Sequence, residues 1–215
     1  MTKNPILKVV NIHKNIKRKN ILNNISFEVD EGDMIGIVGK NASGKSMLYK
    51  AISGLITLSS GEIIINNVNI TKKNVFPKNL GILIEAPGFL PQFSGYKNLK
   101  LLADIKGCIS TDRIKEAMQQ VGLNPDEKLK YKKYSLGMKQ KLGIAQAIME
   151  YPKILLLDEP MNNLDHDSIL QMRELFKSLN ASGTTILLTS HNKEDVELLC
   201  NKVYRIQDGF LEGVI

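Results

Sequence analysis

The sequence contains no apolar run long enough to cross a lipid bilayer. A membrane-spanning helix needs about 20 consecutive apolar residues, and no segment of the 215 residues approaches that length. The opening residues, Met-Thr-Lys-Asn-Pro, do not start a signal-peptide pattern. We therefore expect a cytoplasmic protein. If it works at a membrane, another polypeptide supplies the spans.

Cysteine is scarce, and the chain has no internal repeat or low-complexity linker. Cys108 and Cys200 are the only cysteines, and their separation does not match a metal-binding spacing. This disfavours a disulfide framework and a thiolate metal site. We expect two incidental free thiols.

The net charge of +7 permits an anionic partner such as nucleic acid or a membrane surface. Most lysines are scattered, however, and only residues 14–19 and 128–133 form clusters. Neither cluster carries the interleaved aromatic side chains of a single-strand binding groove. We expect a solvated basic surface.

One segment has the spacing of a phosphate-binding loop, Gly-x-x-x-x-Gly-Lys-Ser. It follows an apolar strand predicted at 34–38 and precedes a helix predicted from 47. Glycines let backbone N–H groups converge, and the helix N-terminus adds positive dipole. The lysine can contact the β- and γ-phosphates, and the serine hydroxyl can ligate magnesium. The alternative is a simple turn with an exposed lysine. The candidate phosphate-binding residues are Gly39, Lys40, Asn41, Ala42, Ser43, Gly44, Lys45 and Ser46.

The rest of the chain predicts a mixed α/β fold. Strands are expected at 6–12 and 21–29, joined by a basic turn, and at 63–65 and 68–70, and these should pair antiparallel. Residues 94–133 are helical in pattern, with a short third helix starting at Asn124, and we interpret this block as an insertion. A strand is expected at 80–85, before the insertion. After the insertion we expect a helix that ends at about 149, a strand at 154–157, a helix at 166–180, a strand at 185–189 and a helix at 193–200.

Two of these strands end in chemistry-bearing residues. Asp158 and Glu159 follow the strand at 154–157, and His191 follows the strand at 185–189. Ligands of open α/β sheets bind at this strand edge. Asp158 could hold magnesium, Glu159 could polarise the attacking water, and His191 could reach the γ-phosphate. The alternatives are turn-forming acids and a surface histidine.

In this order, the motifs resemble the ATPase subunit of an ATP-binding cassette (ABC) transporter. Residues 39–46 are similar to Walker A, 154–159 to Walker B, 162–165 to the D-loop and His191 to the switch histidine. Residues 134–138, Tyr-Ser-Leu-Gly-Met, resemble the family signature but differ from it at three of five positions. The resemblance implies one ABC ATPase domain with a P-loop NTPase (RecA-like) core, an N-terminal antiparallel β-subdomain and an inserted α-helical subdomain. The core with its β-subdomain would span about 1–88 and 134–215, and the helical subdomain about 89–133.

The signature implies that two subunits share each nucleotide, packed head to tail. The Ser135 hydroxyl, the Gly137 N–H and the following helix dipole would then address the partner's ATP, with Asp165 of the D-loop beside it. The alternative for Ser135 is an ordinary helix N-cap.

Two positions depart from the family pattern. Glu85 stands where the family usually has glutamine, and it is still expected to ligate magnesium and to take part in catalysis. Ile16 stands where a tyrosine usually stacks on adenine, so apolar packing would replace stacking. Residues 83–89 together with 135–138 resemble the subgroup that exports bacitracin- and lantibiotic-type peptides, often for producer immunity.

The resemblance implies an ATP-hydrolysing subunit that binds ATP and Mg2+ and drives a transmembrane permease from the inner face of the membrane. It would act as a homodimer or heterodimer, and no direct contact with nucleic acid is expected. The rival is a non-transport cassette ATPase acting on ribosomes or nucleic acid. A generic P-loop kinase does not account for residues 134–138.

Overall fold

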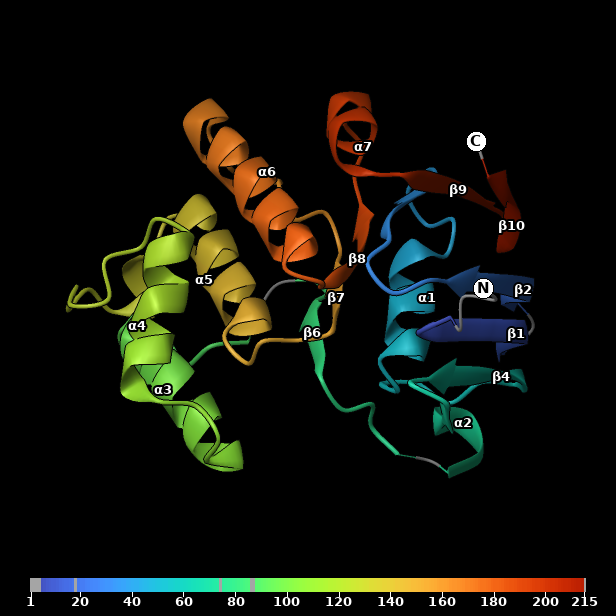
Figure 1. The fold of residues 1–215 in the computed structure, drawn as a ribbon, viewed down its shortest axis with the longest axis horizontal. Helices are drawn as coiled ribbons and strands as arrows, with labels where there is room; N and C mark the ends of the chain where they lie inside the picture. Colours follow the sequence, from blue (N-terminus) through green and yellow to red (C-terminus); the bar gives the residue numbers. More distant parts are fainter. Residues whose placement is uncertain (1–4, 18, 74, 86–87, 215) are drawn as a thin grey trace.

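The computed structural model describes residues 5–17, 19–73, 75–85 and 88–214, which build two β-sheets with helices around them (Figure 1). The smaller sheet has the order β2-β1-β4-β5, and in the described residues its neighbouring strands pair antiparallel, as expected. It comprises β1 (Leu7–Ile16), β2 (Lys19–Val29), β4 (Ser60–Ile65) and β5 (Val68–Asn69). The first two strands are longer than predicted, because most of the basic segment at 14–19 is paired strand and not turn.

The larger sheet has the order β10-β9-β3-β8-β7-β6. Five of its strands run parallel and β10 pairs antiparallel at one edge. The strands are β3 (Met34–Val38), β6 (Leu80–Leu83), β7 (Ile154–Leu157), β8 (Thr185–Thr189), β9 (Lys202–Gln207) and β10 (Phe210–Val214). Because β3, β8 and β7 are parallel neighbours, the segments that follow them meet at one edge of the sheet.

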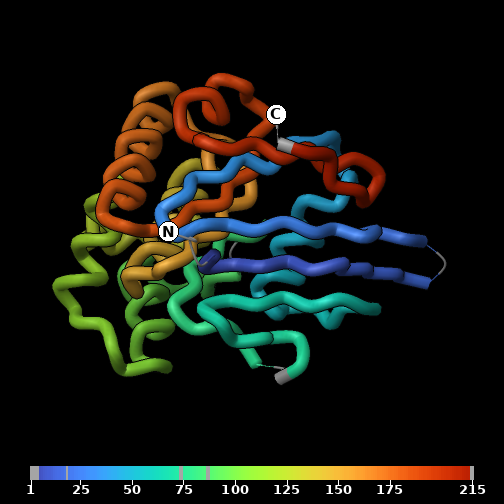
Figure 2. The backbone as a smooth tube through the Cα atoms, turned by 45° about the vertical axis from the view of Figure 1, so that its right-hand side comes forward, coloured from blue at the N-terminus to red at the C-terminus, as the bar shows by residue number. Residues whose placement is uncertain are grey.

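Both faces of the parallel sheet are covered. Along β7, Leu155 and Leu157 pack into the core formed with α3, α4, α5 and α6, whereas Ile154 and Leu156 pack into the core formed with α1 and the smaller sheet. This explains the unbroken apolar runs of the central strands. Figure 2 shows the smaller sheet on one side of the fold and the helices from α3 to α6 on the other. The helices are α1 (Lys45–Ile52), α2 (Ile70–Lys73), α3 (Gly95–Lys106), α4 (Thr111–Gln120), α5 (Leu136–Ile148), α6 (His166–Ala181) and α7 (Lys193–Leu199).

The prediction of a short helix starting at Asn124 is wrong. Residues 124–130 form turns and extended chain, followed by a 3-10 turn at Tyr131–Lys133. The Asn124 side chain accepts a hydrogen bond from the Asp126 N–H at 3.0 Å, so it closes a local turn and does not cap a helix. The two larger helices of the block were predicted correctly, and Ser110 caps the second of them.

The expected free thiols are present. Cys108 is exposed, whereas burial raises the pKa of the Cys200 thiol to about 12. Within the described ranges, no helix combines the length and apolar character that crossing a bilayer requires.

Candidate nucleotide-binding site

The loop between β3 and α1 is shaped by close backbone approach. A Cβ on Gly39 would lie 2.2 Å from the Ile206 carbonyl oxygen, so no larger residue fits there. Gly44 has a φ of +116°, which L side chains rarely adopt, and it begins α1 without a side-chain cap. The uncapped helix start directs unpaired N–H groups towards the loop. The local geometry is that of an anion cradle.

Lysine and serine side chains complete the cradle. Lys45 is buried, and its Nζ donates to the carbonyls of Gly39 and Lys40 at 2.7 and 3.0 Å. The Ser43 Oγ is buried without a hydrogen-bond partner among the described residues. Residues 38–43, with Ser190 and His191, line a cavity of about 730 Å3 that also touches α7 and β9. An anionic ligand at this loop could therefore interact with the Lys45 side chain and the Ser43 hydroxyl.

Ser46 and Asp158 meet across the sheet edge. The Ser46 hydroxyl donates to Asp158 Oδ2 at 2.6 Å, and the Thr189 hydroxyl donates to Asp158 Oδ1 at 2.8 Å. Thr189 ends β8, which lies between β3 and β7, so the central strand orients the carboxylate. A hydroxyl beside a carboxylate fits Mg2+, which takes few protein ligands and completes its octahedron with phosphate oxygens and water.

Glu159 and His191 also lie together, as the sequence predicted. Glu159 Oε2 accepts a hydrogen bond from the His191 backbone N–H at 3.2 Å. Its Oε1 lies 3.1 Å from His191 Nε2 but lacks the alignment of a hydrogen bond. Burial raises the pKa of the Glu159 carboxyl, and the neighbouring His191 opposes that shift. A carboxyl with a raised pKa beside an anion cradle is suited to handle a proton.

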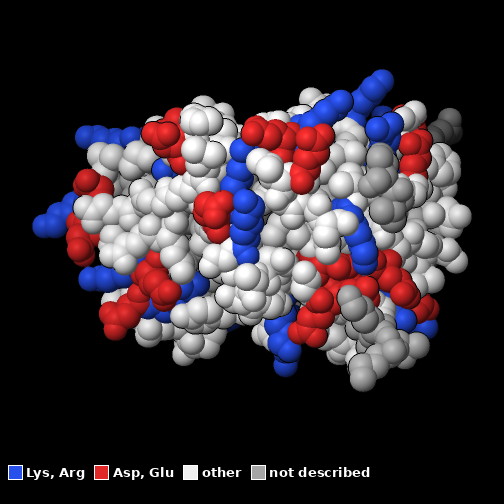
Figure 3. Space-filling view, turned by 45° about the horizontal axis from the view of Figure 1, so that its top comes forward, with Lys and Arg blue, Asp and Glu red and all other residues white. Residues whose placement is uncertain are grey.

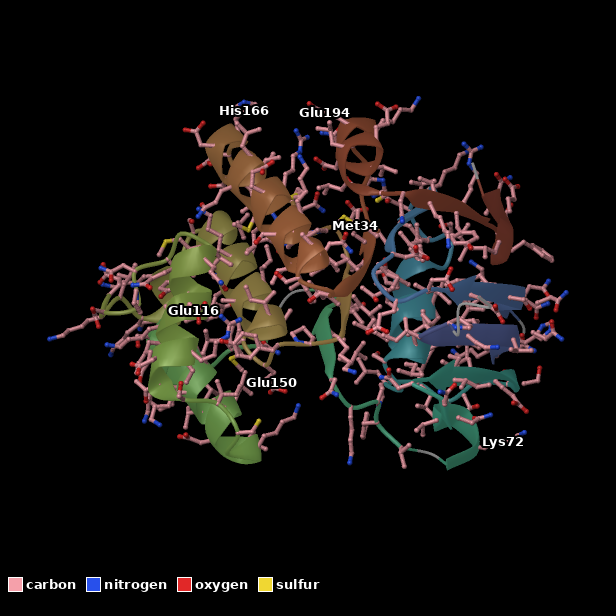
Figure 4. The ribbon with its side chains drawn as sticks, in the orientation of Figure 1. Met34, Lys72, Glu116, Glu150, His166 and Glu194 are labelled. Carbon is pink, nitrogen blue, oxygen red and sulfur yellow. The ribbon has the colours of Figure 1, made fainter. Side chains whose placement is uncertain are left out.

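A buried ion pair that sequence reasoning missed supports the His191 segment. Arg173 of α6 donates to Asp195 of α7 at 2.9 and 2.6 Å, and the two residues are 5% and 2% exposed. Asp195 also accepts from the hydroxyl of Ser190, the residue before His191. Glu194 pairs with the same arginine from the solvent side, where α7 stands beside α6 (Figure 4). Nothing in the sequence spacing couples these helices.

We expect Asp195→Asn to destabilise the protein by about 3 kcal/mol, because it removes the buried carboxylate and leaves the buried guanidinium with only the exposed Glu194 as its ionic partner. Glu194→Gln is the matched control, since it removes the exposed carboxylate from the same arginine and should change stability much less. Urea unfolding of both variants measures the difference. Equal losses would mean that burial does not distinguish the two carboxylates.

The signature and D-loop residues line a second cavity of about 710 Å3. Ser135 is the N-cap of α5, and its Oγ accepts a hydrogen bond from the Met138 N–H at 3.1 Å. In the single chain, Ser135 therefore makes the hydrogen bond of an ordinary helix N-cap, which was the alternative expected from the sequence. A Cβ on Gly137 would lie 2.9 Å from the Asn163 carbonyl oxygen. The signature and the D-loop therefore lie in close contact at this glycine. Asp165 caps α6 through the Ser168 N–H, and hydrogen bonding to the Ser168 side chain and then to its backbone lowers the pKa of the Asp165 carboxyl.

Gln140 is a second residue that the sequence did not single out. Its Nε2 donates to the carbonyls of Glu159 and Pro160 at 3.0 and 3.1 Å. Glu159 has a φ of +51°, an uncommon conformation for a residue with a side chain. One amide of α5 therefore holds the peptide of the carboxylate that contacts His191. A glutamine within a helix gives no signal of this in the sequence.

Glu85 and Ile16 were also singled out from the sequence. Glu85 follows β6 with a φ of +59°, and its carboxylate pairs with Lys50 of α1 at 2.5 Å. Ile16 ends β1 opposite Lys19 and is 42% exposed. Neither residue belongs to the walls of the cavity at the phosphate loop. That cavity and the one at Ser135 have no lining residue in common.

Comparison with known families shows which family the chain belongs to. Residues 22–162 match the family model described as ABC transporter. The chain belongs to the ATP-binding cassette (ABC) transporter family. It is therefore an ATP-binding cassette with ATPase activity, and the fold class expected from the sequence is confirmed.

Similar ABC proteins cover almost the whole chain. It is 42% identical over 207 residues to the uncharacterized ABC transporter ATP-binding protein YybJ of Bacillus subtilis, covering 96% of this chain and 95% of that protein. It is 35% identical over 204 residues to the lantibiotic transport ATP-binding protein SrtF of Streptococcus pyogenes, covering 95% and 88%. It is 36% identical over 208 residues to the bacitracin transport ATP-binding protein BcrA of Bacillus licheniformis, covering 96% and 68%.

A solved ABC cassette has the same fold. It is a dimeric ATP-binding cassette in a post-hydrolysis state bound to ADP and Pi, with a TM-score of 0.88, 24% sequence identity and coverage of 97% of both chains. The match covers almost the whole chain. It establishes the cassette architecture from end to end of the described chain.

Proposed function

We propose that this chain is the ATP-hydrolysing subunit of a membrane exporter that removes a peptide antibiotic of the lantibiotic or bacitracin type. The observation that carries the proposal is its identity of 35 to 36% with transport proteins named for those compounds, over 95 to 96% of the chain. The subunit would sit at the inner face of the membrane, bound to a permease.

The site residues have distinct proposed roles. The loop at 39–46 binds the phosphates of ATP, and Ser46, Asp158 and Glu85 are the residues that would hold Mg2+. Glu159 orients the attacking water and His191 contacts the γ-phosphate. Ile16 packs against adenine. When bound, the ion supplies positive charge to the phosphates.

Two copies would complete each site. In one chain, the phosphate loop and the signature line different cavities. A second copy, placed head to tail, would bring Ser135, Gly137 and Asp165 against the first copy's nucleotide. The helix dipole of α5 then faces the γ-phosphate.

The permease is proposed to dock on a groove beside the helical insertion. Two cavities of about 250 Å3 each share Leu102 and Gln146 in their walls. One includes Phe89 and Leu90, and the other includes Ile105, which is 80% exposed. An amphipathic cytoplasmic helix of the permease would cover this apolar surface. Residues 89–133 would then move as a subdomain relative to the core.

The ribosome or nucleic-acid alternative is less well supported. On the face in Figure 3, lysine and arginine side chains are interspersed with acidic ones and do not form one continuous basic surface. Nucleic-acid binding depends on a concentrated basic footprint. The dispersed charge on this face therefore gives no support to nucleic-acid binding there.

The test is protection of a sensitive cell. We expect expression of the chain with the permease that co-purifies from detergent-solubilised membranes to raise the inhibitory concentration of bacitracin or a lantibiotic. The matched control, Lys45→Met, should abolish protection because it removes the charge at the phosphates. Recovery with nuclease-treated ribosomes and not with membranes would contradict the proposal.

A further inference from the structure

Lys50 lies on α1 near Ser46 and Asp158, the residues proposed to hold magnesium. It has no role in the catalysis described above. It lies four residues after Ser46 in α1, so both side chains project from the same face of the helix. Ser46 contacts Asp158, and the Asp158 N–H donates to the Leu83 carbonyl at 2.7 Å. Leu83 ends β6, two residues before Glu85. The Lys50–Glu85 pair closes this ring at 2.5 Å.

Three acidic residues follow strands at this edge of the sheet. Asp158, Glu159 and Glu85 follow the ends of neighbouring strands, and the triphosphate that the phosphate loop is proposed to bind adds more negative charge. A carboxylate at position 85 would repel that nucleotide unless a cation balances it. Lys50 is the cation that the structure pairs with it.

Solvent exposure argues against a purely structural role for this pair. The side chain of Glu85 is 63% exposed and that of Lys50 is 27% exposed. Ion pairs this exposed contribute little to stability. The left-handed backbone at Glu85 is uncommon for a residue with a side chain, and such backbone strain is found at functional sites. The pair is better explained by what its charge does at the site.

We propose that Lys50 is a positioning residue that neutralises Glu85 and holds its carboxylate beside the magnesium position. This inference rests on the proposed function and adds a partner to Glu85, which is proposed there as a magnesium ligand. The Lys50–Glu85 pair supplies a net neutral group at this edge. Loss of Lys50 leaves an uncompensated carboxylate that repels nucleotide in the absence of Mg2+.

The experiment measures binding of a fluorescent, non-hydrolysable ATP analogue, with Mg2+ and with EDTA, to the purified full chain. The quantity compared is the ratio of the dissociation constant in EDTA to that in Mg2+. We expect Lys50→Met to increase this ratio about tenfold when Glu85 is present, a size typical of coupling between neighbouring sites. In the background of Glu85→Gln, Lys50→Met should change the ratio by less than about twofold, because no carboxylate remains to be neutralised. Lys50→Arg should restore the wild-type ratio, since arginine still pairs with a carboxylate.

Lys72→Met is the matched control. Lys72 pairs with Glu62 at 2.6 Å in a comparable exposed ion pair on α2, away from the phosphate loop (Figure 4). This variant should leave the ratio unchanged. An equal effect of Lys50→Met in both backgrounds would overturn the inference. No effect of Lys50→Met in either background, while Glu85→Gln alone changes the ratio, would overturn the inference but leave Glu85 at the metal. No effect of any of these substitutions would overturn the inference and remove Glu85 from the metal as well. If the wild-type chain did not bind the analogue, the proposed function itself would fail.

Discussion

Glu159→Gln is expected to retain ATP binding and to lower turnover by about a hundredfold or more, the contribution typical of a general base. Glutamine keeps the size of the side chain but cannot accept a proton from water. Because hydrolysis would normally separate the two copies, the variant should accumulate as ATP-bound dimers. Steady-state phosphate release and size-exclusion chromatography with ATP measure the two effects.

The same substitution should also change the pH dependence of stability. Burial raises the pKa of Glu159 in the folded protein, so ionisation of this carboxyl opposes folding. The wild-type protein therefore loses stability as pH rises from the ordinary carboxyl pKa through the raised one. Glu159→Gln cannot ionise, so its free energy of unfolding should exceed that of the wild type above this window, and the excess should shrink as the pH falls.

Glu174→Gln is the control for the measurements of ATP turnover and of stability against pH. Glu174 lies on α6 and pairs with Lys177 in an exposed contact away from the loop at 39–46. It should hydrolyse ATP at the wild-type rate. Undiminished turnover in Glu159→Gln would remove Glu159 from the catalytic role.

Local signals were sufficient to predict the phosphate loop and the central strands. The loop at 39–46 is contiguous, and its glycines are required by backbone geometry that one short segment defines. The alternation of Ile25, Phe27 and Val29 with exposed neighbours likewise reports a half-buried strand, and the structure has it. Where chemistry and spacing lie in the same few residues, sequence alone is informative.

Contacts between distant segments were not predictable in the same way. Gln140 lies 19 residues from Glu159, and Arg173 lies 22 residues from Asp195. Each reads as an ordinary polar residue on a helix until the packing of helices and strands brings the partners together. The helix expected from Asn124 failed for a related reason, because an asparagine can hydrogen-bond its own turn as readily as it caps a helix.

Two inactive variants of this chain are expected to restore activity when mixed. Lys45→Met disables the phosphate loop but leaves the signature intact, and Ser135→Arg blocks the signature but leaves the loop intact. If sites are shared between copies, each homodimer has no complete site, whereas the mixed dimer has one. Random pairing then gives up to about a quarter of wild-type activity, as follows from two-fold symmetric association.

The result depends on Ser135 acting across the interface and not merely as a cap. Ser110→Arg is the matched control, because Ser110 caps α4 through the same kind of hydrogen bond but does not line the cavity shared by the signature and D-loop. It should lose about 1 kcal/mol of stability, the usual cost of removing a serine cap, and keep its ATPase activity. Activity that stays absent in mixtures in which dimers form would show that both halves of the site come from one chain. Recovery on mixing, and its absence from either variant alone, is possible only if the phosphate loop of one copy works with the α5 N-terminus of another.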